Sequence, residues 1–156
     1  MRQVIDKGLS PLLPEGYDMV KMVYLLLDDG DNRFLRQYDL TQVQFYALQR
    51  LADESKMLSQ LSKELLCDPS NITRVADILE RKGLITRQRD QKDRRITWAT
   101  LTSEGQALCH KVRQAHDDYI HQRMNLLNEA EQLHLNLLLG KLGAGLSQQL
   151  QSQTLF

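Results

Sequence analysis

The sequence predicts a mainly α-helical protein with one small β-hairpin, an α+β fold in which the hairpin directly follows a helix with one polar face. Two observations predict this fold. Apolar residues recur at helical spacing over most of the chain, and two short alternating segments flank a charged turn at residues 90–95. The chain has 156 residues, 42% of them apolar and 26% charged, as is typical of globular proteins. This length fits one compact domain, or a small domain with an oligomerisation extension.

The first predicted helix covers residues 17–27, where nearly every side chain is apolar, and Pro14 is a boundary signal shortly before it. The sequence DDGDN at residues 28–32 predicts a turn or a weak point. Phe34, Leu35 and Tyr38 then resume the apolar pattern.

Two further helices are expected before the middle of the chain. Residues 40–53 predict an amphipathic helix of about three turns, with Thr41 as its N-cap. Its apolar face comprises Val43, Ala47, Leu48 and Leu51. Residues 53–56 form a polar break, and residues 59–66 predict a short helix with Leu61, Leu65 and Leu66 directed inward.

The next helix is bounded at both ends. Asp68 is suited to cap its first N–H groups, Pro69 to its first position and Gly83 to its C-terminal stop. The apolar residues fall on one face with the spacing i, i+3, i+4 and i+7: Ile72, Val75, Ala76 and Leu79. The other faces carry polar side chains capable of hydrogen bonding: Ser70, Asn71, Thr73, Arg74 and Asp77.

Residues 84–89 and 96–101 alternate in polarity and predict two strands, joined by a tip with the sequence DQKDRR. A helix is expected from Thr102 to about Leu127. The last predicted helix, residues 129–150, contains eight leucines, too many for a free surface helix. It is therefore expected to pack against another helix, most simply one from a second subunit.

The formal net charge of zero conceals an uneven distribution of charge. Residues 81–95 hold seven basic and two acidic side chains, a local charge of +5, whereas the other 141 residues hold 13 basic and 18 acidic side chains. A basic segment of this kind attracts phosphate backbones, although a solvated charged loop has the same composition.

Several function classes lack support in the sequence. The two cysteines, Cys67 and Cys109, are too few for a disulfide framework and lack metal-finger spacing, which favours a reducing cytoplasm. Residues 1–16 show no export signal, and no apolar run is long enough to span a bilayer. His110, Asp117 and His121 share a helix face without a diagnostic metal-ligand spacing. No catalytic set or glycine-rich phosphate loop is present, so neither enzyme activity nor a cofactor is expected.

The order of helix, helix, short turn, polar-faced helix and basic hairpin defines a winged helix-turn-helix. In such a fold the second helix enters the major groove of DNA, where its N-terminal side chains reach base edges. Asn71 and Arg74 are the candidates for direct base readout, and Ser70 and Thr73 are suited to phosphates. Arg94 or Arg95 at the hairpin tip would enter the minor groove, with Lys92 on the backbone.

The chain resembles the MarR (multiple antibiotic resistance regulator) family of bacterial transcription factors. The resemblance lies in LTQVQFYALQRLAD at residues 40–53, in LSKELLCDPSNITRVADILERKGLITR at residues 61–87, and above all in the wing text DQKDRRITWATLTSEG at residues 90–105. An Asp-Arg-Arg wing followed by Leu-Thr-x-x-Gly is specific for that family, and the order of parts agrees over residues 17–150.

The resemblance implies a homodimer that binds a pseudo-palindromic double-stranded DNA operator. Residues 1–40 and 102–156 would form an intertwined helical dimerisation region, and residues 41–101 the winged helix-turn-helix domain. Within the wing, Asp93 matches the aspartate that orients nearby arginines. The resemblance further implies repression, release by a small aromatic ligand or an oxidant, and a ligand pocket near Arg36, Tyr38, Phe45 and Tyr46, although core packing is the simpler role for both Phe45 and Tyr46.

Two alternatives remain open at this point. One is a winged-helix module for protein contact that uses the leucine-rich terminal helix. The other is a redox-sensing regulator acting through Cys67, whose thiol lies immediately before the polar-faced helix, so that its oxidation would couple directly to DNA binding.

Overall fold

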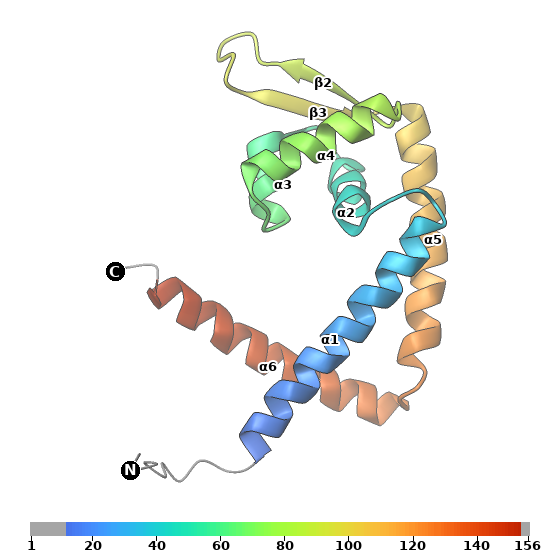
Figure 1. Ribbon diagram of the computed structural model, residues 1–156, viewed down its shortest axis with the longest axis vertical. Coiled ribbons are helices and arrows are strands. Elements are labelled where there is room, and N and C mark those ends of the chain that lie inside the picture. Colours follow the sequence, from blue (N-terminus) through green and yellow to red (C-terminus); the bar gives the residue numbers. More distant parts are fainter. Residues whose placement is uncertain (1–11, 154–156) are drawn as a thin grey trace, which may run out of the picture. The chain divides into compact units, whose positions relative to one another are not determined.

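The computed structural model describes residues 12–153, which form two compact units divided between Val112 and Arg113. The elements in chain order are α1 (Leu12–Arg36), α2 (Gln42–Leu51), β1 (Lys56–Met57), α3 (Leu58–Glu64), α4 (Pro69–Arg81), β2 (Ile85–Arg89), β3 (Thr97–Leu101), α5 (Ser103–Met124) and α6 (Glu129–Gln153) (Figure 1). The strands form one antiparallel sheet in the order β1-β3-β2. The predicted mainly α-helical fold with a small hairpin is thus confirmed.

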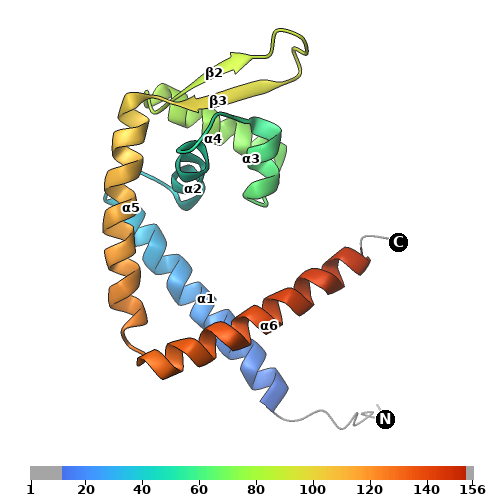
Figure 2. The same cartoon turned by 180° about the vertical axis from the view of Figure 1, so that it is seen from behind.

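The core of the first unit lies between α2, α4 and the sheet, which pack together in both views (Figure 2). All four apolar residues predicted to face inward from α4 are buried, namely Ile72, Val75, Ala76 and Leu79. Phe45 and Leu48 of α2 are completely buried against them. The helical spacing of the sequence therefore identified the packed face of α4 correctly.

The ends of α2 and α4 follow the predicted signals with one exception. Thr41 and Gln44 form a capping box, in which the Gln44 amide donates to Thr41 Oγ1 over 3.3 Å and the Thr41 amide donates to Gln44 Oε1 over 3.1 Å. Gly83 ends α4 with a φ of +71°. Asp68 occupies the N-cap position of α4, but its side chain makes no capping hydrogen bond, so that part of the prediction is wrong.

The turn predicted at residues 28–32 is also wrong, because α1 continues through it. Asp29 pairs with Arg33 one turn later at 2.8 Å, and Asn32 donates to Asp28 over 3.1 Å. Gln42 at the start of α2 donates to the Asp28 carboxylate over 2.9 Å. Charged residues at i and i+4 stabilise a helix, and the contact with α2 ties the segment to the core.

Strand β1 begins at Lys56, the last residue of the predicted polar break, and includes Met57. Lys56 pairs with Ala99 and Met57 with Trp98, so β3 becomes the central strand of the sheet. The Ser55 and Thr100 hydroxyls share a hydrogen bond of 2.7 Å beside this pairing. Two residues are too few to show an alternating pattern, and only their pairing with β3 makes them a strand.

Leu66 was expected to face inward, but its side chain is 95% exposed and its φ is +50°. It lies just beyond the end of α3 in a Schellman motif. The Leu66 amide donates to the Lys63 carbonyl and the Cys67 amide to the Ser62 carbonyl. Gly83 occupies the equivalent position after α4, with the same two types of hydrogen bond. Leu66 thus occupies a backbone position that favours glycine.

The first turn of α5 packs tightly against the residue before β2. Thr102 donates from its amide to the Leu84 carbonyl over 3.1 Å and from its hydroxyl to the Gly83 carbonyl over 2.7 Å. A Cβ at Gly105 would overlap the Leu84 carbonyl oxygen and lie 2.9 Å from its carbon. The glycine of the Leu-Thr-x-x-Gly sequence is therefore required by a close approach of two backbones.

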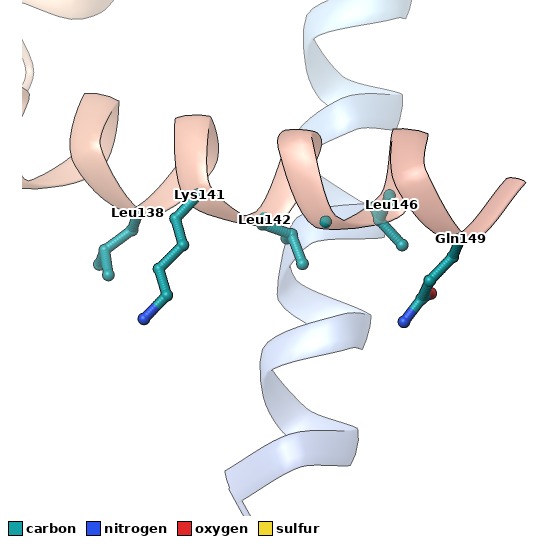
Figure 3. A pocket seen from close by; sticks show the side chains of 6 residues that line it. Leu138, Lys141, Leu142, Leu146 and Gln149 are labelled. Carbon is teal, nitrogen blue, oxygen red and sulfur yellow. The ribbon is translucent and has the colours of Figure 1, made fainter. Parts of the chain in front are cut away.

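The second unit, described from Arg113 to Gln153, contains the end of α5 and all of α6. Asn128 and Glu131 form a capping box at the start of α6, and Gln132 donates to the Met124 and Leu127 carbonyls. Leu138, Leu142 and Leu146 line a shallow hollow on one side of α6, together with Lys141 and Gln149 (Figure 3). None of the helices within residues 12–153 is both long and apolar enough to cross a membrane.

The conformation of Leu66 generates a prediction about stability. Leu66→Gly should raise the free energy of unfolding by about 1 kcal/mol, because a left-handed conformation costs an L-residue about 1–2 kcal/mol and glycine loses part of that gain to its freer unfolded chain. Urea unfolding at one fixed protein concentration measures the change.

Leu66→Ala is the matched control, because it shortens the same exposed side chain while keeping the Cβ atom. It should leave stability close to that of the wild type. Equal stability of the glycine and alanine variants would show that the backbone at residue 66 is unstrained.

Candidate nucleic-acid interface

The two faces of α4 divide its residues into core and candidate contacts. Opposite the buried face, Ser70, Thr73 and Arg74 are exposed and Asn71 is half-buried. All four lie in the first two turns of the helix, the part that reaches base edges when such a helix enters a major groove. The structure therefore brings the four predicted residues of α4 onto one polar surface.

Within this surface, two side chains already contact each other. The Arg74 guanidinium donates to Asn71 Oδ1 over 3.4 Å, a long hydrogen bond. The Thr73 hydroxyl donates to the Pro69 carbonyl over 2.9 Å, which leaves its oxygen lone pairs free to accept. Asn71 and Arg74 thus present an amide and a guanidinium side by side, the groups that bind adenine and guanine, respectively, in a bidentate manner.

Arg87 of β2 joins the hairpin to α4. Its guanidinium lies 2.7 Å from Asp77 Oδ1 and 2.6 Å from Glu80 Oε2, and its backbone amide donates to Glu80 Oε1 over 3.1 Å. The hydrogen bond from Arg87 lowers the pKa of the Glu80 carboxyl, and the same pairing raises the pKa of Arg87. Because both partners of Arg87 belong to α4, this three-residue clamp holds the wing in a defined position relative to the helix.

The clamp and one further ion pair change the interpretation of the local charge. Arg87 is neutralised by α4, and Lys82 pairs with Asp39 at 2.8 Å. In contrast, Lys92, Arg94 and Arg95 are exposed, and none has a carboxylate partner within 4.0 Å among residues 12–153. Arg81 and Arg89 also lack a carboxylate partner among the described residues, so five of the seven basic side chains of residues 81–95 are uncompensated, and three of these five lie at the tip of the hairpin.

The conformation of the tip depends on two aspartates. Asp93 Oδ1 accepts a hydrogen bond from the Arg95 amide over 2.9 Å. Asp90 accepts from the amides of Lys92 and Asp93 over 2.8 and 3.0 Å, and from Trp98 Nε1 over 3.3 Å. These bonds hold the pKa of the Asp90 carboxyl below its ordinary value, with the backbone amides as the main cause. Asp93 thus contacts the backbone of a wing arginine.

Sequence reasoning missed the roles of Glu80, Arg87, Asp90 and Trp98. The offsets of two and three residues after Asp90 are typical of an aspartate that accepts from backbone amides in a turn, and they were a usable signal. The clamp had no such local signal, because Asp77 and Glu80 share a helix whereas Arg87 lies on the next strand.

The residues predicted to line a ligand pocket have different environments. Phe45 is completely buried in the core, and its ring lies 5.7 Å from that of Tyr46. Burial, with smaller contributions from Asp31 and Asp28, raises the pKa of the Tyr46 hydroxyl. Tyr38 is half-buried against Phe34, and Arg36 is exposed at the end of α1. Buried Phe45 fits the simpler role in core packing, and the ligand role of the four residues stays a prediction.

Cys67 is a half-buried free thiol and Cys109 a buried one. Within residues 12–153 no three side chains of His, Cys, Asp or Glu converge as a metal site would require.

Known proteins similar to this chain are regulators of transcription. A family model described as MarR family matches residues 40–97. The transcriptional regulator PecS of Dickeya dadantii is 30% identical over 140 residues, which are 87% of this chain and 83% of PecS. The transcriptional repressor MprA of Escherichia coli is 31% identical over 123 residues, 77% of this chain and 70% of MprA.

A solved structure is also similar to most of the chain. It is a crystal structure of a mutant of MarR from E. coli complexed with operator DNA, 29% identical, with a TM-score of 0.72 over 84% of this chain and 94% of that one. This likeness confirms the winged helix-turn-helix fold. The relatives are named as regulators of transcription rather than enzymes, as expected from the sequence.

The clamp generates a prediction about pH. Glu80→Gln should lower the free energy of unfolding near neutral pH by about 0.5–1 kcal/mol, a value discounted because the Glu80 side chain is 38% exposed. The pKa of Glu80 is depressed, so its contribution is complete above the ordinary value of 4.5 and is lost as the pH falls through the lowered pKa.

The difference between wild type and variant should therefore shrink as urea unfolding is repeated from about pH 7 to about pH 3. Glu104→Gln, a change at an exposed carboxylate in the first turn of α5, is the control for general charge effects. A difference for Glu80→Gln that stays constant down to the lowest pH would contradict an ionic clamp.

Proposed function

Because this chain belongs to the MarR family of transcriptional regulators, we propose that it is a sequence-specific double-stranded DNA-binding protein that acts as a homodimeric repressor in the cytoplasm. The observation that carries this proposal is the pairing of a polar first half of α4 with an uncompensated cationic wing tip, held together by the Arg87 clamp. A DNA duplex presents bases in its grooves and phosphates on both sides, and this surface offers groups for each.

Each predicted residue has a role in this proposal. Asn71 and Arg74 contact base edges in the major groove, whereas the hydroxyls of Ser70 and Thr73 contact phosphates. Arg94 or Arg95 enters the minor groove, where a narrow A·T-rich segment attracts guanidinium groups, and Lys92 contacts the backbone. Asp93 supports the wing through its hydrogen bond with the Arg95 amide.

The exposed leucines support the homodimer. Leu133, Leu137 and Leu138 of α6 are each more than 60% exposed, as are several apolar side chains of α1, including Tyr17, Met19 and Leu25. Apolar surface of this extent indicates a face that packs against another chain. We assign this role to residues 1–40 and 102–156, of which 1–11 and 154–156 lie outside the described part, and DNA binding to residues 41–101.

The dimer would repress transcription by occupying an operator and blocking the access of the transcription machinery to that DNA. The E. coli relative was crystallised with operator DNA, and MprA is named a repressor. Release by a small aromatic effector near Arg36, Tyr38, Phe45 and Tyr46 is part of the proposal, since a ligand that favours one separation of the two wings would change operator affinity.

The wing generates the first functional prediction. Arg94→Ala and Arg95→Ala should each weaken operator binding about tenfold, because each removes an uncompensated cation from the tip. For each interaction with a phosphate that is removed, the slope of log affinity against log salt should fall by about 0.9. Fluorescence anisotropy of labelled duplex at several salt concentrations measures both quantities.

Arg50→Ala is the control, because it removes a positive charge that lies outside the tip and 3.7 Å from the Glu64 carboxylate. Wild-type affinity in both single variants and in the double variant would exclude the wing from DNA binding. A shallow salt dependence of the wild type would favour the protein-contact alternative.

The polar face of α4 generates the second functional prediction, tested by selection of binding sites from random duplex DNA. The wild type should recover an inverted repeat, because a dimer presents two copies of α4 to the two half-sites. Asn71→Ala and Arg74→Ala should each relax preference at one position of each half-site, a loss of about 1–3 kcal/mol of discrimination.

Ser70→Ala is the internal control, since removing an interaction with a phosphate weakens binding to all sequences alike without changing base preference. If base preference survived at every position in both the Asn71 and Arg74 variants, α4 would not be the element that recognises bases.

A further inference from the structure

The hairpin tip contains a carboxylate whose position is unexpected for a surface that binds DNA. Asp90 ends the segment that leads from β2 into the tip, and it is surrounded in sequence by Arg89, Lys92, Arg94 and Arg95. A negative charge here opposes the approach of a phosphate backbone. Among its described neighbours, however, its carboxylate binds no cationic side chain and accepts instead from three neutral N–H groups.

Two of these three hydrogen bonds form the turn at the tip, and the third joins the two sides of the hairpin. Oδ1 accepts from the amides of Lys92 and Asp93, which folds residues 90–93 into a turn. Oδ2 accepts from the indole N–H of Trp98, which lies on β3 across the hairpin. The Asp90 amide also donates to the Ile96 carbonyl over 3.0 Å, and the Ile96 amide donates to the Asp93 carbonyl over 2.9 Å.

Trp98 is itself fixed by the sheet. It pairs with Gln88 of β2 on one side and with Met57 of β1 on the other, and its side chain is half-buried. The indole therefore provides a donor on a strand held from both sides, and Asp90 transfers that constraint to the loop. Lys92, Arg94 and Arg95 project from the loop that these bonds close.

We propose that Asp90 and Trp98 form a positioning pair that fixes the direction in which the wing presents Arg94 and Arg95 to DNA. The inference rests on the proposed DNA-binding function and names two residues that act on DNA through others. The pair holds the tip in one conformation before DNA binds. Less binding free energy is then lost in ordering the cationic side chains on the DNA. The three N–H donors place partial positive charge against the Asp90 carboxylate, which reduces its repulsion of a phosphate.

The direction in which Asp90→Ala changes the affinity for DNA distinguishes a positioning role from a simple effect of charge. Removing a negative charge from a DNA-binding wing should tighten binding and steepen its salt dependence if charge alone matters. If Asp90 positions the arginines, Asp90→Ala should weaken operator binding about tenfold, the loss expected when one wing arginine no longer makes its charge-assisted hydrogen bond with a phosphate. The salt slope should then become shallower, although the variant carries one more net positive charge.

Two further variants test separately the hydrogen bonds of Asp90 with the turn amides and its hydrogen bond with the indole of Trp98. Asp90→Asn retains an oxygen that accepts from the turn amides but places an NH₂ group toward the indole donor, so it should weaken binding less than Asp90→Ala. Trp98→Phe keeps an aromatic ring on β3 and removes only the N–H donor. The double variant Asp90→Ala/Trp98→Phe should bind no more weakly than Asp90→Ala, because both changes break one pair.

The experiment measures affinity and salt slope for the full-length wild type and these variants on the selected operator, with urea midpoints to establish that each variant is folded. Glu104→Gln is the matched control for loss of one carboxylate outside the wing. Trp98 is the chain's only tryptophan, so its emission reports on the pair directly. We expect the emission of Asp90→Ala to differ from that of the wild type before DNA is added.

Each outcome decides between the possibilities. A wild type that binds no duplex would overturn the proposed function and this inference with it. A wild type that binds DNA, together with an Asp90→Ala variant that binds equally or more tightly, would overturn the positioning role alone. Strictly additive losses in the double variant would also overturn it, since the two residues would then act independently.

Discussion

The burial of one face of α4 is the constraint on which the rest of the first unit depends. Ile72, Val75, Ala76 and Leu79 leave water only if α2 and the sheet cover them, and this packing leaves the opposite face of the same helix free. Schellman motifs end both α3 and α4. The motif after α3 turns the chain toward α4, and the motif after α4 turns it toward β2. The polar surface of α4 is therefore a consequence of core packing as much as of its own composition.

Ion pairs add to the contacts made by this packing. Arg87 binds two carboxylates of α4, Lys82 binds Asp39, and the cations left without a carboxylate in the described part of the basic segment include those at the wing tip. The formal charge of zero is thus a balance between the local charge of +5 over residues 81–95 and the acidic excess of the other 141 residues. A surface of this kind attracts a polyanion at one place and limits unspecific attraction elsewhere.

The two units differ in how far their apolar side chains are buried. In the first unit, α2, α4 and the sheet bury a common core, whereas α6 in the second unit exposes leucines along its length. The long α1 also exposes apolar side chains while its C-terminal part is tied to α2 through Asp28 and Gln42. This exposed apolar surface supports the proposed homodimer, in which a second copy of the chain would cover it.

Local patterns in the amino-acid sequence were sufficient for α4, for the hairpin and for the caps at Thr41 and Gly83, because each depends on neighbours within a few residues. They also indicated that Asn71, Arg74, Arg94 and Arg95 are chemically suited to DNA, a role that stays a proposal. Strand β1, the exposure of Leu66, the clamp at Arg87 and the turn organised by Asp90 became visible when the chain was folded. Strand β1, the clamp at Arg87 and the bond between Asp90 and Trp98 depend on partners on other elements, just as Lys82 pairs with Asp39 43 residues away, and helical or strand periodicity carries no information about such pairs. The position of Leu66 and the turn after Asp90 depend instead on local backbone hydrogen bonds, which the periodicity of apolar residues does not describe. Folding decides which charges are neutralised within the protein and which remain available for binding.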